Sequence, residues 1–298
     1  MKLSVVICSY NREKFILDAL NSLAAQSIDK NDFEIVVINN NSTDHTEAIC
    51  RKFGADHPYL NYIYDIETVQ GLSSARNRGI AVSSGNYIAF IDDDALAERD
   101  YAANIISAFE KYPQYDAVGG KVLPIYPNDK EPAWMSHHIQ GVVSKVDMGD
   151  KFMEFRKKYP VGCNMAFRKE VFEELGGFNT DLLLRNDDKF IFLKLKRNNK
   201  RTLYVPDAVV HHNIDAYRLE HGFIRNLSKL IGSTEKIRLQ TEPRRYMFMK
   251  PMEYLFKWGA SLVLGILFLL KGQPAKARYI IMIRWLVLAG FLGRGTNT

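Results

Sequence analysis

The first ninety residues alternate short apolar runs with segments of helical pattern, and this alternation constrains the fold more than any other feature. The runs cover residues 3–8, 33–38, 59–64 and 87–91. They consist largely of β-branched and aromatic residues, as in strands buried on both faces of a parallel sheet. Repeated strand and helix units predict an α/β domain with a mostly parallel sheet and right-handed crossovers.

The regular alternation ends near Tyr115, and residues 124–150 are predicted to form a long loop. Loops of this length inside a domain are usually functional, so we expect a lid or one wall of a binding site here. Helical patterns return further along the chain, followed by two short strands. The expected helices are 169–175 and 187–197, and the expected strands are 202–205 and 208–212.

The positive charge of the chain is concentrated in its last part. Residues 216–298 contain 14 Lys and Arg against 4 Asp and Glu, whereas residues 1–215 contain 26 against 30. Two apolar segments in this part, 254–270 and 279–292, carry one charge each. A spanning helix needs ~20 apolar residues, with ~17 as a lower limit, so the first segment is borderline and the second too short. We therefore expect a monotopic helix pair whose cations reach anionic lipid head groups.

Two alternatives to a membrane role stay open for residues 216–298. The helix pair could pack on the first domain, or it could join two copies of the chain in a homo-oligomer. The three cysteines, Cys8, Cys50 and Cys163, are far apart and odd in number, which fits neither a disulfide framework nor a CxxC metal site. The N-terminal apolar run is too short for a signal peptide. We expect a peripheral or monotopic protein on the cytoplasmic face of the cell membrane.

Polar clusters follow the first, second and fourth apolar runs. They are residues 9–12, 39–42 and 92–94. Ligands of open α/β sheets bind at the carboxyl ends of the strands, so these clusters mark the expected site. A dinucleotide oxidoreductase is disfavoured, because residues 9–12 stand where a GxGxxG turn would be required. Nucleic acid is not an expected partner, since the basic residues are interleaved with an apolar tail.

Three consecutive carboxylates end the fourth run. In an extended chain Asp92 and Asp94 point to one side, so the pair could share a hard cation such as Mg²⁺ or Mn²⁺ that bridges phosphate oxygens. A solvated turn and helix cap is the alternative. Arg76 and Arg78 lie on a predicted helix beside the same edge, where an arginine suits phosphate recognition. The alternative for either arginine is an exposed charge or a structural ion pair.

Seven short motifs resemble, in the same order, the successive signatures of family 2 glycosyltransferases with the GT-A fold. They are residues 5–12, 38–44, 71–79, 90–94, 162–168, 176–178 and 206–210. Each motif alone is weak, but seven in order make the resemblance specific. It implies an α/β fold with a Rossmann-like mixed sheet flanked by helices. Residues 1–112 would be the nucleotide-binding half and 113–215 the acceptor-binding half of a catalytic domain, with 216–298 as a helical extension.

The resemblance also implies which residues bind the donor, a nucleotide-diphosphate sugar. The donor would be contacted by Ser9, Tyr10, Arg12, Asn40, Arg76, Asp92 and Asp93. Asp94 would hold a Mn²⁺ or Mg²⁺ cofactor on the diphosphate, together with Asp92 and His212. The family often has an acidic residue where Asn39 and Asn40 stand, and an amide oxygen accepts a hydrogen bond from uracil more weakly. A UDP donor is therefore not specified.

Asp187 and Asp188 align with the Glu-Asp pair that the family usually carries. In an inverting transfer an acceptor hydroxyl attacks the anomeric carbon opposite the leaving diphosphate, and a nearby carboxylate takes its proton. Metal and arginine stabilise the departing charge. We predict Asp188 as the base, with Asp187 holding the acceptor or a loop. The alternative is that both residues cap the following helix.

Trp134 and Asn164 each allow two interpretations. Trp134 could stack on an acceptor sugar or anchor its loop to the core, and Asn164 could bind the acceptor or stabilise a turn. Of His211 and His212, strand alternation lets one point inward, and His212 matches the histidine of the family. His137 and His138 are expected to be exposed polar residues.

The resemblance implies an inverting glycosyltransferase acting on a membrane-associated acceptor, such as a lipid-linked glycan, in polysaccharide or glycoconjugate synthesis. One alternative keeps the fold and transfers the sugar to polyprenyl phosphate itself. Another is a non-catalytic membrane adaptor that retains the fold. The presence of Asp92, Asp94 and Asp188 argues against the adaptor, since an adaptor needs none of them.

Overall fold

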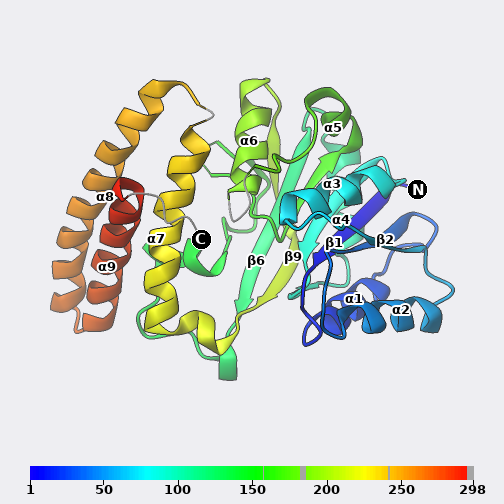
Figure 1. The fold of residues 1–298 in the computed structure, drawn as a ribbon, viewed down its shortest axis with the longest axis horizontal. Helices are drawn as coiled ribbons and strands as arrows, with labels where there is room; N and C mark the ends of the chain where they lie inside the picture. The colour runs from blue at the N-terminus through cyan, green and yellow to red at the C-terminus, as the bar shows by residue number, and fades with distance from the viewer. Residues whose placement is uncertain (157, 182–185, 241, 294–298) are drawn as a thin grey trace. The chain divides into compact units, whose positions relative to one another are not determined.

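The computed structural model describes residues 1–156, 158–181, 186–240 and 242–293 of the chain (Figure 1). The chain divides into two compact units. The first unit comprises Met1–Pro124, Lys145–Leu183 and Asp187–Asn213, and we call the other, Ile125–Ser144, Leu184–Asn186 and Ile214–Thr298, the helical unit. The long loop predicted for the first domain therefore contributes residues 125–144 to the helical unit, which the sequence did not indicate.

A nine-stranded mixed sheet forms the first unit, with the order β3-β2-β1-β4-β8-β6-β9-β5 and β7 paired with β9. Strands β1 to β4 run parallel, and β8 runs antiparallel to both β4 and β6. The strands are β1 (Leu3–Ser9), β2 (Phe33–Asn39), β3 (Tyr62–Ile66), β4 (Tyr87–Asp92), β5 (Ala95–Ala97), β6 (Ala117–Ile125), β7 (Met153–Glu154), β8 (Met165–Arg168) and β9 (Thr202–Asn213). The predicted α/β class with a Rossmann-like mixed sheet is confirmed.

Helices cover both faces of this sheet. The core on one face contains residues of α1 (Ile16–Ala24), α2 (Thr46–Asp56) and α4 (Tyr101–Lys111). The other core contains residues of α3 (Leu72–Val82), α5 (Lys169–Leu175) and α6 (Asp187–Arg197). Successive residues of β1 alternate between the two cores, with Val5 in the first and Val6 in the second. Both faces of the strand are buried, which explains its uninterrupted apolar sequence.

Two predicted boundaries differ from the structure. The third strand begins at Tyr62 instead of Tyr59, because residues 57–60 form a turn closed by the Leu60 N–H donating to the His57 carbonyl. The two strands expected at 202–205 and 208–212 are one strand, β9. It pairs with β7 at Leu203 and Tyr204 and with β5 from Val210 to His212, and Pro206 falls between these two pairings.

The described residues of the helical unit form three long helices, two 3₁₀ turns of the predicted loop and a third 3₁₀ turn before the first long helix. Its helices are α7 (His221–Leu239), α8 (Arg244–Leu270) and α9 (Pro274–Leu292), with 3₁₀ turns η1 (Pro127–Asp129), η2 (His137–Val143) and η3 (Ala216–Leu219). Helix α9 packs closely on α7. A Cβ added at Gly290 would lie only 2.1 Å from the Lys229 carbonyl oxygen. Helix α9 also packs on α8, where a Cβ on Gly265 would lie 2.7 Å from Ile281.

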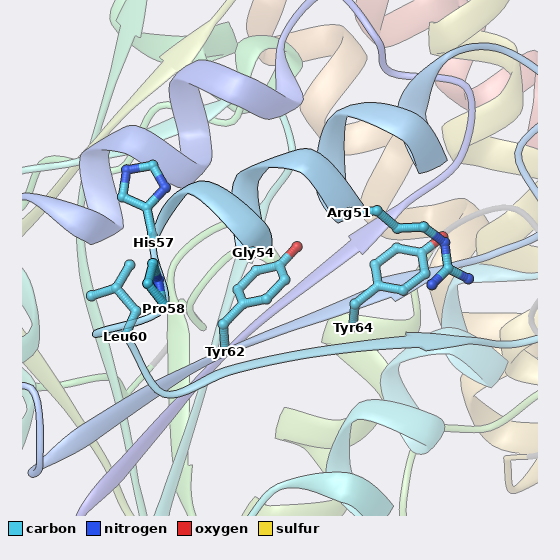
Figure 2. A pocket seen from close by; sticks show the side chains of 7 residues that line it. All are labelled: Arg51, Gly54, His57, Pro58, Leu60, Tyr62 and Tyr64. Carbon is cyan, nitrogen blue, oxygen red and sulfur yellow. The ribbon is translucent and has the colours of Figure 1, made fainter.

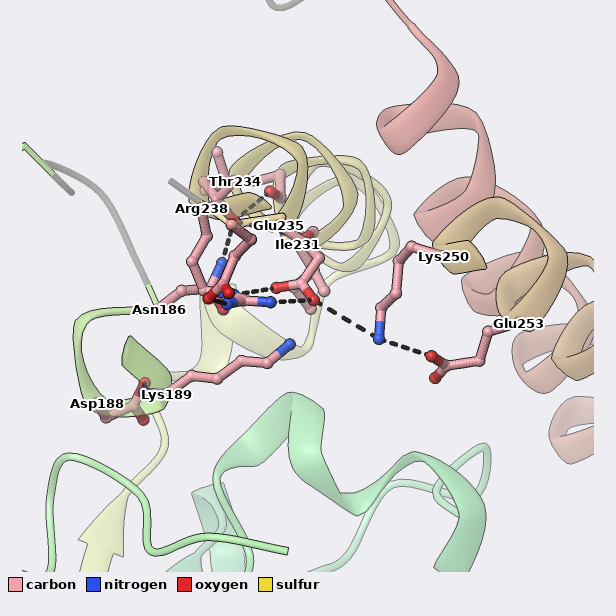
Figure 3. Close-up of polar contacts among 11 residues, drawn as sticks. Asn186, Asp188, Lys189, Ile231, Thr234, Glu235, Arg238, Lys250 and Glu253 are labelled. Atoms are coloured by element: carbon pink, nitrogen blue, oxygen red, sulfur yellow. Dashed lines mark hydrogen bonds and ion pairs between the residues drawn. The ribbon is translucent and has the colours of Figure 1, made fainter. Parts of the chain in front are cut away.

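Charged side chains join α7 to the start of α8 (Figure 3). Arg238 is 4% exposed and pairs with Glu235 and Glu242, each at 2.9 Å. Lys250 extends this network by lying 3.5 Å from Glu235 and 2.8 Å from Glu253. The buried charges are thus compensated within the helical unit, as burial requires.

Helix α8 exposes an apolar surface. Among the described residues it is the one helix long and apolar enough to cross a membrane by length and composition, and 11% of its most apolar window is buried. The exposed side chains include Phe248, Phe256, Val263, Ile266 and Leu270. The sequence predicted the apolar part of this helix but placed its beginning at residue 254, ten residues too late.

Candidate functional site

The carboxyl ends of three neighbouring strands meet at one edge of the sheet. In the register of the sheet Ser9 lies beside Asn39 of β2, and Cys8 lies beside Asp92 of β4. This parallel alignment brings together the three polar clusters that the sequence places after the strands. The predicted site residues on these strands therefore occupy a single edge, as expected for an open α/β sheet.

Asp92, Asp94 and His212 form a group that could hold a metal ion. One ligand atom from each residue lies within 4.8 Å of the others. His212 reaches this group because β9 pairs with β5, which sets His212 opposite Ala95, and its Nε2 lies 3.1 Å from Oδ1 of Asp94. Two carboxylates and an imidazole suit Mn²⁺ or Mg²⁺, so these side chains fit a hard divalent cation.

The neighbouring histidine points away from this group. His211 Nε2 lies 2.9 Å from a carboxylate oxygen of Glu98, whereas His212 is 2% exposed. The predicted alternation between the two histidines is thus observed. His212 is the one that faces the carboxylates.

Burial and mutual repulsion alter the acidity of the carboxylates on this edge. Burial raises the pKa of Asp93 to about 7, although Arg12, 3.4 Å away, opposes the change. Burial also raises the pKa of Asp92, and neighbouring Asp94 adds to the effect while Arg76 opposes it. A positive charge close to Asp92 and Asp93 therefore stabilises their ionised forms. Arg12 supplies part of it, with its Nη2 3.7 Å from Asp94.

Arg76 is enclosed by protein groups. It is 3% exposed and forms an ion pair with Asp187 of α6. Its Nη2 lies 3.6 Å from Asp92 and 3.3 Å from the Gly162 carbonyl oxygen. Burial opposes the charge of Arg76, but Asp187 and Asp92 outweigh it and raise its pKa. The structural ion pair considered for one arginine is therefore formed by Arg76, and its contact with a nucleotide stays a prediction.

Arg78, on the same helix, is the exposed counterpart. It pairs with Asp65 at 2.7 Å, and its side chain is 44% exposed. Both arginines thus have carboxylate partners, but only Arg76 belongs to the candidate site.

Asp187 and Asp188 begin α6 and have different partners. Asp187 is 6% exposed and is held by Arg76. Asp188 is half-buried, and its Oδ2 accepts a hydrogen bond from the Gly162 N–H at 3.3 Å. Gly162 therefore touches both Arg76 and Asp188, and a Cβ at this position would lie 2.5 Å from the Arg76 guanidinium. The sequence places Gly162 in the motif of residues 162–168 but indicates no role for it.

The amide of Asn40 is occupied by backbone groups. Its Nδ2 donates to the Glu67 and Val69 carbonyls at 2.9 and 2.8 Å. Its Oδ1 accepts from the Gly71 N–H at 2.8 Å. Asn40 thus fixes the loop before α3, and contact with a nucleobase stays a prediction. Tyr10, in contrast, is 49% exposed at the same edge, while Ser9 is buried.

The two predicted acceptor residues are both buried. Trp134 is 8% exposed and stacks on Tyr279 of α9, with ring centroids 4.7 Å apart and planes at 10°. Asn164 is fully buried and donates to the carbonyls of Lys121 and Ala208 at 3.0 and 2.8 Å, which joins β6 to β9. The stacking of Trp134 matches its anchoring alternative, whereas Asn164 joins two strands instead of stabilising a turn. Their contact with an acceptor stays a prediction.

The site does not coincide with a pocket elsewhere in the first unit. That pocket, of about 450 Å³, lies between α2 and β3 (Figure 2). It is lined by Arg51, Gly54, His57, Pro58, Leu60, Tyr62 and Tyr64, none of which is a candidate site residue. The candidate site at the polar edge of the sheet is therefore separate from this aromatic pocket.

Comparison with known proteins agrees with this architecture. A glucosyl-dolichyl phosphate glucuronosyltransferase of Haloferax volcanii is 27% identical over 235 residues, which cover 75% of this chain and 73% of that protein. The minor teichoic acid biosynthesis protein GgaB of Bacillus subtilis is 25% identical over 71% of the chain, but the match spans only 23% of that protein.

Solved structures share the fold. A mannosyltransferase of Pyrobaculum calidifontis, solved in complex with GDP-Man and Mn²⁺, superimposes with a TM-score of 0.66 at 20% identity, covering 96% of this chain and 87% of that one. At the level of sequence, the model of glycosyl transferase family 2 matches residues 4–176, more than half of the chain. The chain therefore belongs to glycosyl transferase family 2.

Proposed function

We propose that the protein is an inverting, metal-dependent transferase that moves a sugar from a nucleotide-diphosphate sugar to a hydroxyl of a lipid-linked glycan. The observation that carries this proposal is the convergence of Asp92, Asp94 and His212 within 4.8 Å of one another. The Mn²⁺ named with the Pyrobaculum calidifontis structure supports the same cofactor class.

Each neighbouring residue has a part in this reaction. The cation, when bound, supplies positive charge to the diphosphate as the bond between sugar and phosphate breaks. Asp188 accepts the proton of the acceptor hydroxyl while its oxygen bonds to the anomeric carbon, and the nucleoside diphosphate leaves. Asp187 is committed to Arg76, so it is the less suitable base. Arg76 positions Asp92 and the Gly162 backbone around the reacting groups.

The acceptor side of the proposal rests on the helical unit and on the relatives. The name of the Haloferax volcanii enzyme includes a dolichyl phosphate, and that of the Bacillus subtilis protein refers to teichoic acid. An exposed apolar helix such as α8 would bring this chain to a membrane surface, where a lipid-linked acceptor lies.

We propose that α8 lies along the cytoplasmic membrane surface instead of crossing the bilayer. Helix α9 packs between α7 and α8 through close glycine contacts, so α8 cannot enter the bilayer alone. Arg225 and Lys229 of α7 are exposed. A charge at the bilayer centre costs about 2.5–3.5 kcal/mol on insertion scales, so a surface position is favoured. There, Lys257 and Lys271 can reach anionic head groups.

A transfer to polyprenyl phosphate itself is the second candidate. It would need no carboxylate base, because a phosphate acceptor is already ionised at neutral pH. The hydrogen bond between Gly162 and Asp188, which holds that carboxylate in place, therefore favours a hydroxyl acceptor.

The proposal can be tested by a screen of nucleotide sugars for hydrolysis by the full chain. Each donor is incubated with Mn²⁺, with Mg²⁺ and with EDTA, and release of the nucleoside diphosphate is measured. We expect one donor class to be cleaved with a metal ion and spared with EDTA. Cleavage that persists in EDTA would contradict the metal assignment, and no turnover or binding of any donor would favour the adaptor.

A further inference from the structure

A second pocket of the first unit lies outside the candidate site. It has a volume of about 280 Å³, and its walls come from residues 154–159 without residue 157, from α6 and from the start of β9. None of the predicted donor, metal, base or acceptor residues lines it. Its lining separates into an apolar floor and a rim of cations.

The floor is held in place by aromatic packing. Phe192 is 5% exposed and stacks on Phe167 with ring centroids 5.2 Å apart and planes at 23°. Tyr159 lies parallel to Phe192 at 6.5 Å, and Phe155 meets Tyr204 edge-on at 5.8 Å. Because these rings are fixed by neighbours, the floor exists before any ligand binds. A preformed surface lowers the entropy cost of binding.

The rim carries an excess of positive charge. Two of its cations are neutralised, since Arg201 lies 2.6 Å from Glu154 and Lys200 lies 2.7 Å from Glu174. Three others line the same pocket: Arg156, Lys158 and Lys196. In the part of the chain that the structure describes, these three have no carboxylate within ion-pair distance. Lys196 donates to the Arg156 backbone carbonyl at 3.1 Å, which ties the Lys196 side chain to the segment that carries Arg156.

We propose that this pocket binds an acidic saccharide, of one or two sugar rings that carry carboxylates. The half-buried rings of Phe155 and Tyr159 offer apolar contact to the face of a sugar ring, and the three cations fit carboxylates through charge-assisted hydrogen bonds. The volume is close to the lower end of the ~300–1,000 Å³ typical of ligand pockets, which suits so small a unit. A bare inorganic anion would gain nothing from the aromatic floor. The pocket would hold the saccharide by recognition alone, with no bond made or broken.

The test uses digalacturonate as the probe, with maltose and inorganic phosphate as comparators. Binding to the full chain is measured by calorimetry in EDTA, so that metal-dependent donor binding does not contribute. The pocket variant is Lys158→Gln/Lys196→Gln. The control variant is Lys52→Gln/Lys111→Gln, which removes two exposed charges of the first unit from α2 and α4. Urea unfolding of both variants verifies that they fold as the wild type does.

We expect digalacturonate to bind the wild type and the control equally and to bind the pocket variant roughly tenfold more weakly, since two charge-assisted contacts are lost. Phe155→Ala should weaken digalacturonate without changing phosphate. Equal affinity in the pocket variant, or no binding to the wild type at millimolar probe, would overturn the proposal. Phosphate binding as tight as that of digalacturonate would overturn the saccharide assignment. None of these binding measurements depends on catalysis, so a failure of this proposal can be distinguished from a failure of the proposed function.

Discussion

Arg76 of α3 and Asp187 of α6 form an ion pair in which the side chains are 3% and 8% exposed. The pair ties the helix that follows the third strand to the helix that carries the candidate base. Asp92 and the Gly162 carbonyl share the same guanidinium. Loss of this one cation would therefore disturb the metal group, the base and the fold together.

Arg76→Met is expected to lower the free energy of unfolding by about 3–5 kcal/mol, because it leaves Asp187 buried without its partner. Arg78→Met, two residues along the same helix, removes an exposed pair and should cost about 0–1 kcal/mol. Urea unfolding measures both. A double variant Arg76→Met/Asp187→Leu should recover part of the loss, and equal losses for Arg76→Met and Arg78→Met would refute the burial argument.

Asp94→Asn is expected to weaken binding of the donor in the presence of Mn²⁺ by roughly tenfold or more, since it removes a charged ligand of the cation. Calorimetric titration of the donor found in the hydrolysis screen gives the affinity. Asp65→Asn, a carboxylate outside the metal group, serves as the control. Metal-dependent binding that is unchanged in Asp94→Asn would show that the cation binds elsewhere.

Asp188→Asn is expected to leave donor affinity nearly intact and to reduce transfer by about 10²–10⁴-fold, the range of a general base. Single-turnover transfer and calorimetry separate the two effects. If Asp188→Asn transfers normally while Asp187→Asn does not, the roles of the two aspartates must be exchanged.

Gly232→Ala is expected to destabilise the helical unit by about 1–3 kcal/mol, because its Cβ would lie 2.0 Å from the Val287 carbonyl oxygen of α9. Gly259→Ala on α8 meets nothing within 4 Å and should stabilise the helix by up to ~1 kcal/mol. Thermal unfolding of both variants measures the two changes in stability. A neutral Gly232→Ala would mean that α7 and α9 are further apart than described.

Phe256→Glu and Leu270→Glu are expected to reduce flotation of the full chain with anionic liposomes, since both side chains are at least three-quarters exposed on α8. The reason is the loss of apolar burial together with repulsion from acidic head groups. Tyr59→Glu, exposed in the first unit, should float as the wild type does. If the wild type itself stays in the soluble fraction as a defined oligomer, α8 serves subunit contact instead.

The sequence predicted those parts of the molecule that depend on local pattern. The buried strands were found because their two-sided burial leaves a continuous apolar run, and the edge of the sheet followed from the polar residues behind each run. The sequence did not indicate which residues each side chain contacts. Nothing near Asn40 in sequence indicates that its amide binds the backbone at Gly71, and nothing near Trp134 indicates its stacking on Tyr279.

The sequence also did not indicate which distant strands pair with one another. The sequence predicted two short strands at 202–205 and 208–212. In the structure β9 continues through Pro206 and pairs with β7 before it and with β5 after it. The membership of residues 125–144 in the helical unit has the same origin, because it depends on contacts with α9.

The pairing of β5 with β9 also affects how the protein acquires its metal group. Asp94 and His212 are 118 residues apart in the sequence, so they meet only after a large chain loop has closed. Contacts between such distant segments form slowly and late in folding. Ligands that bind only the completed arrangement shift the folding equilibrium toward it by mass action. A cation bound by Asp94 and His212 would therefore also stabilise the folded state of the protein.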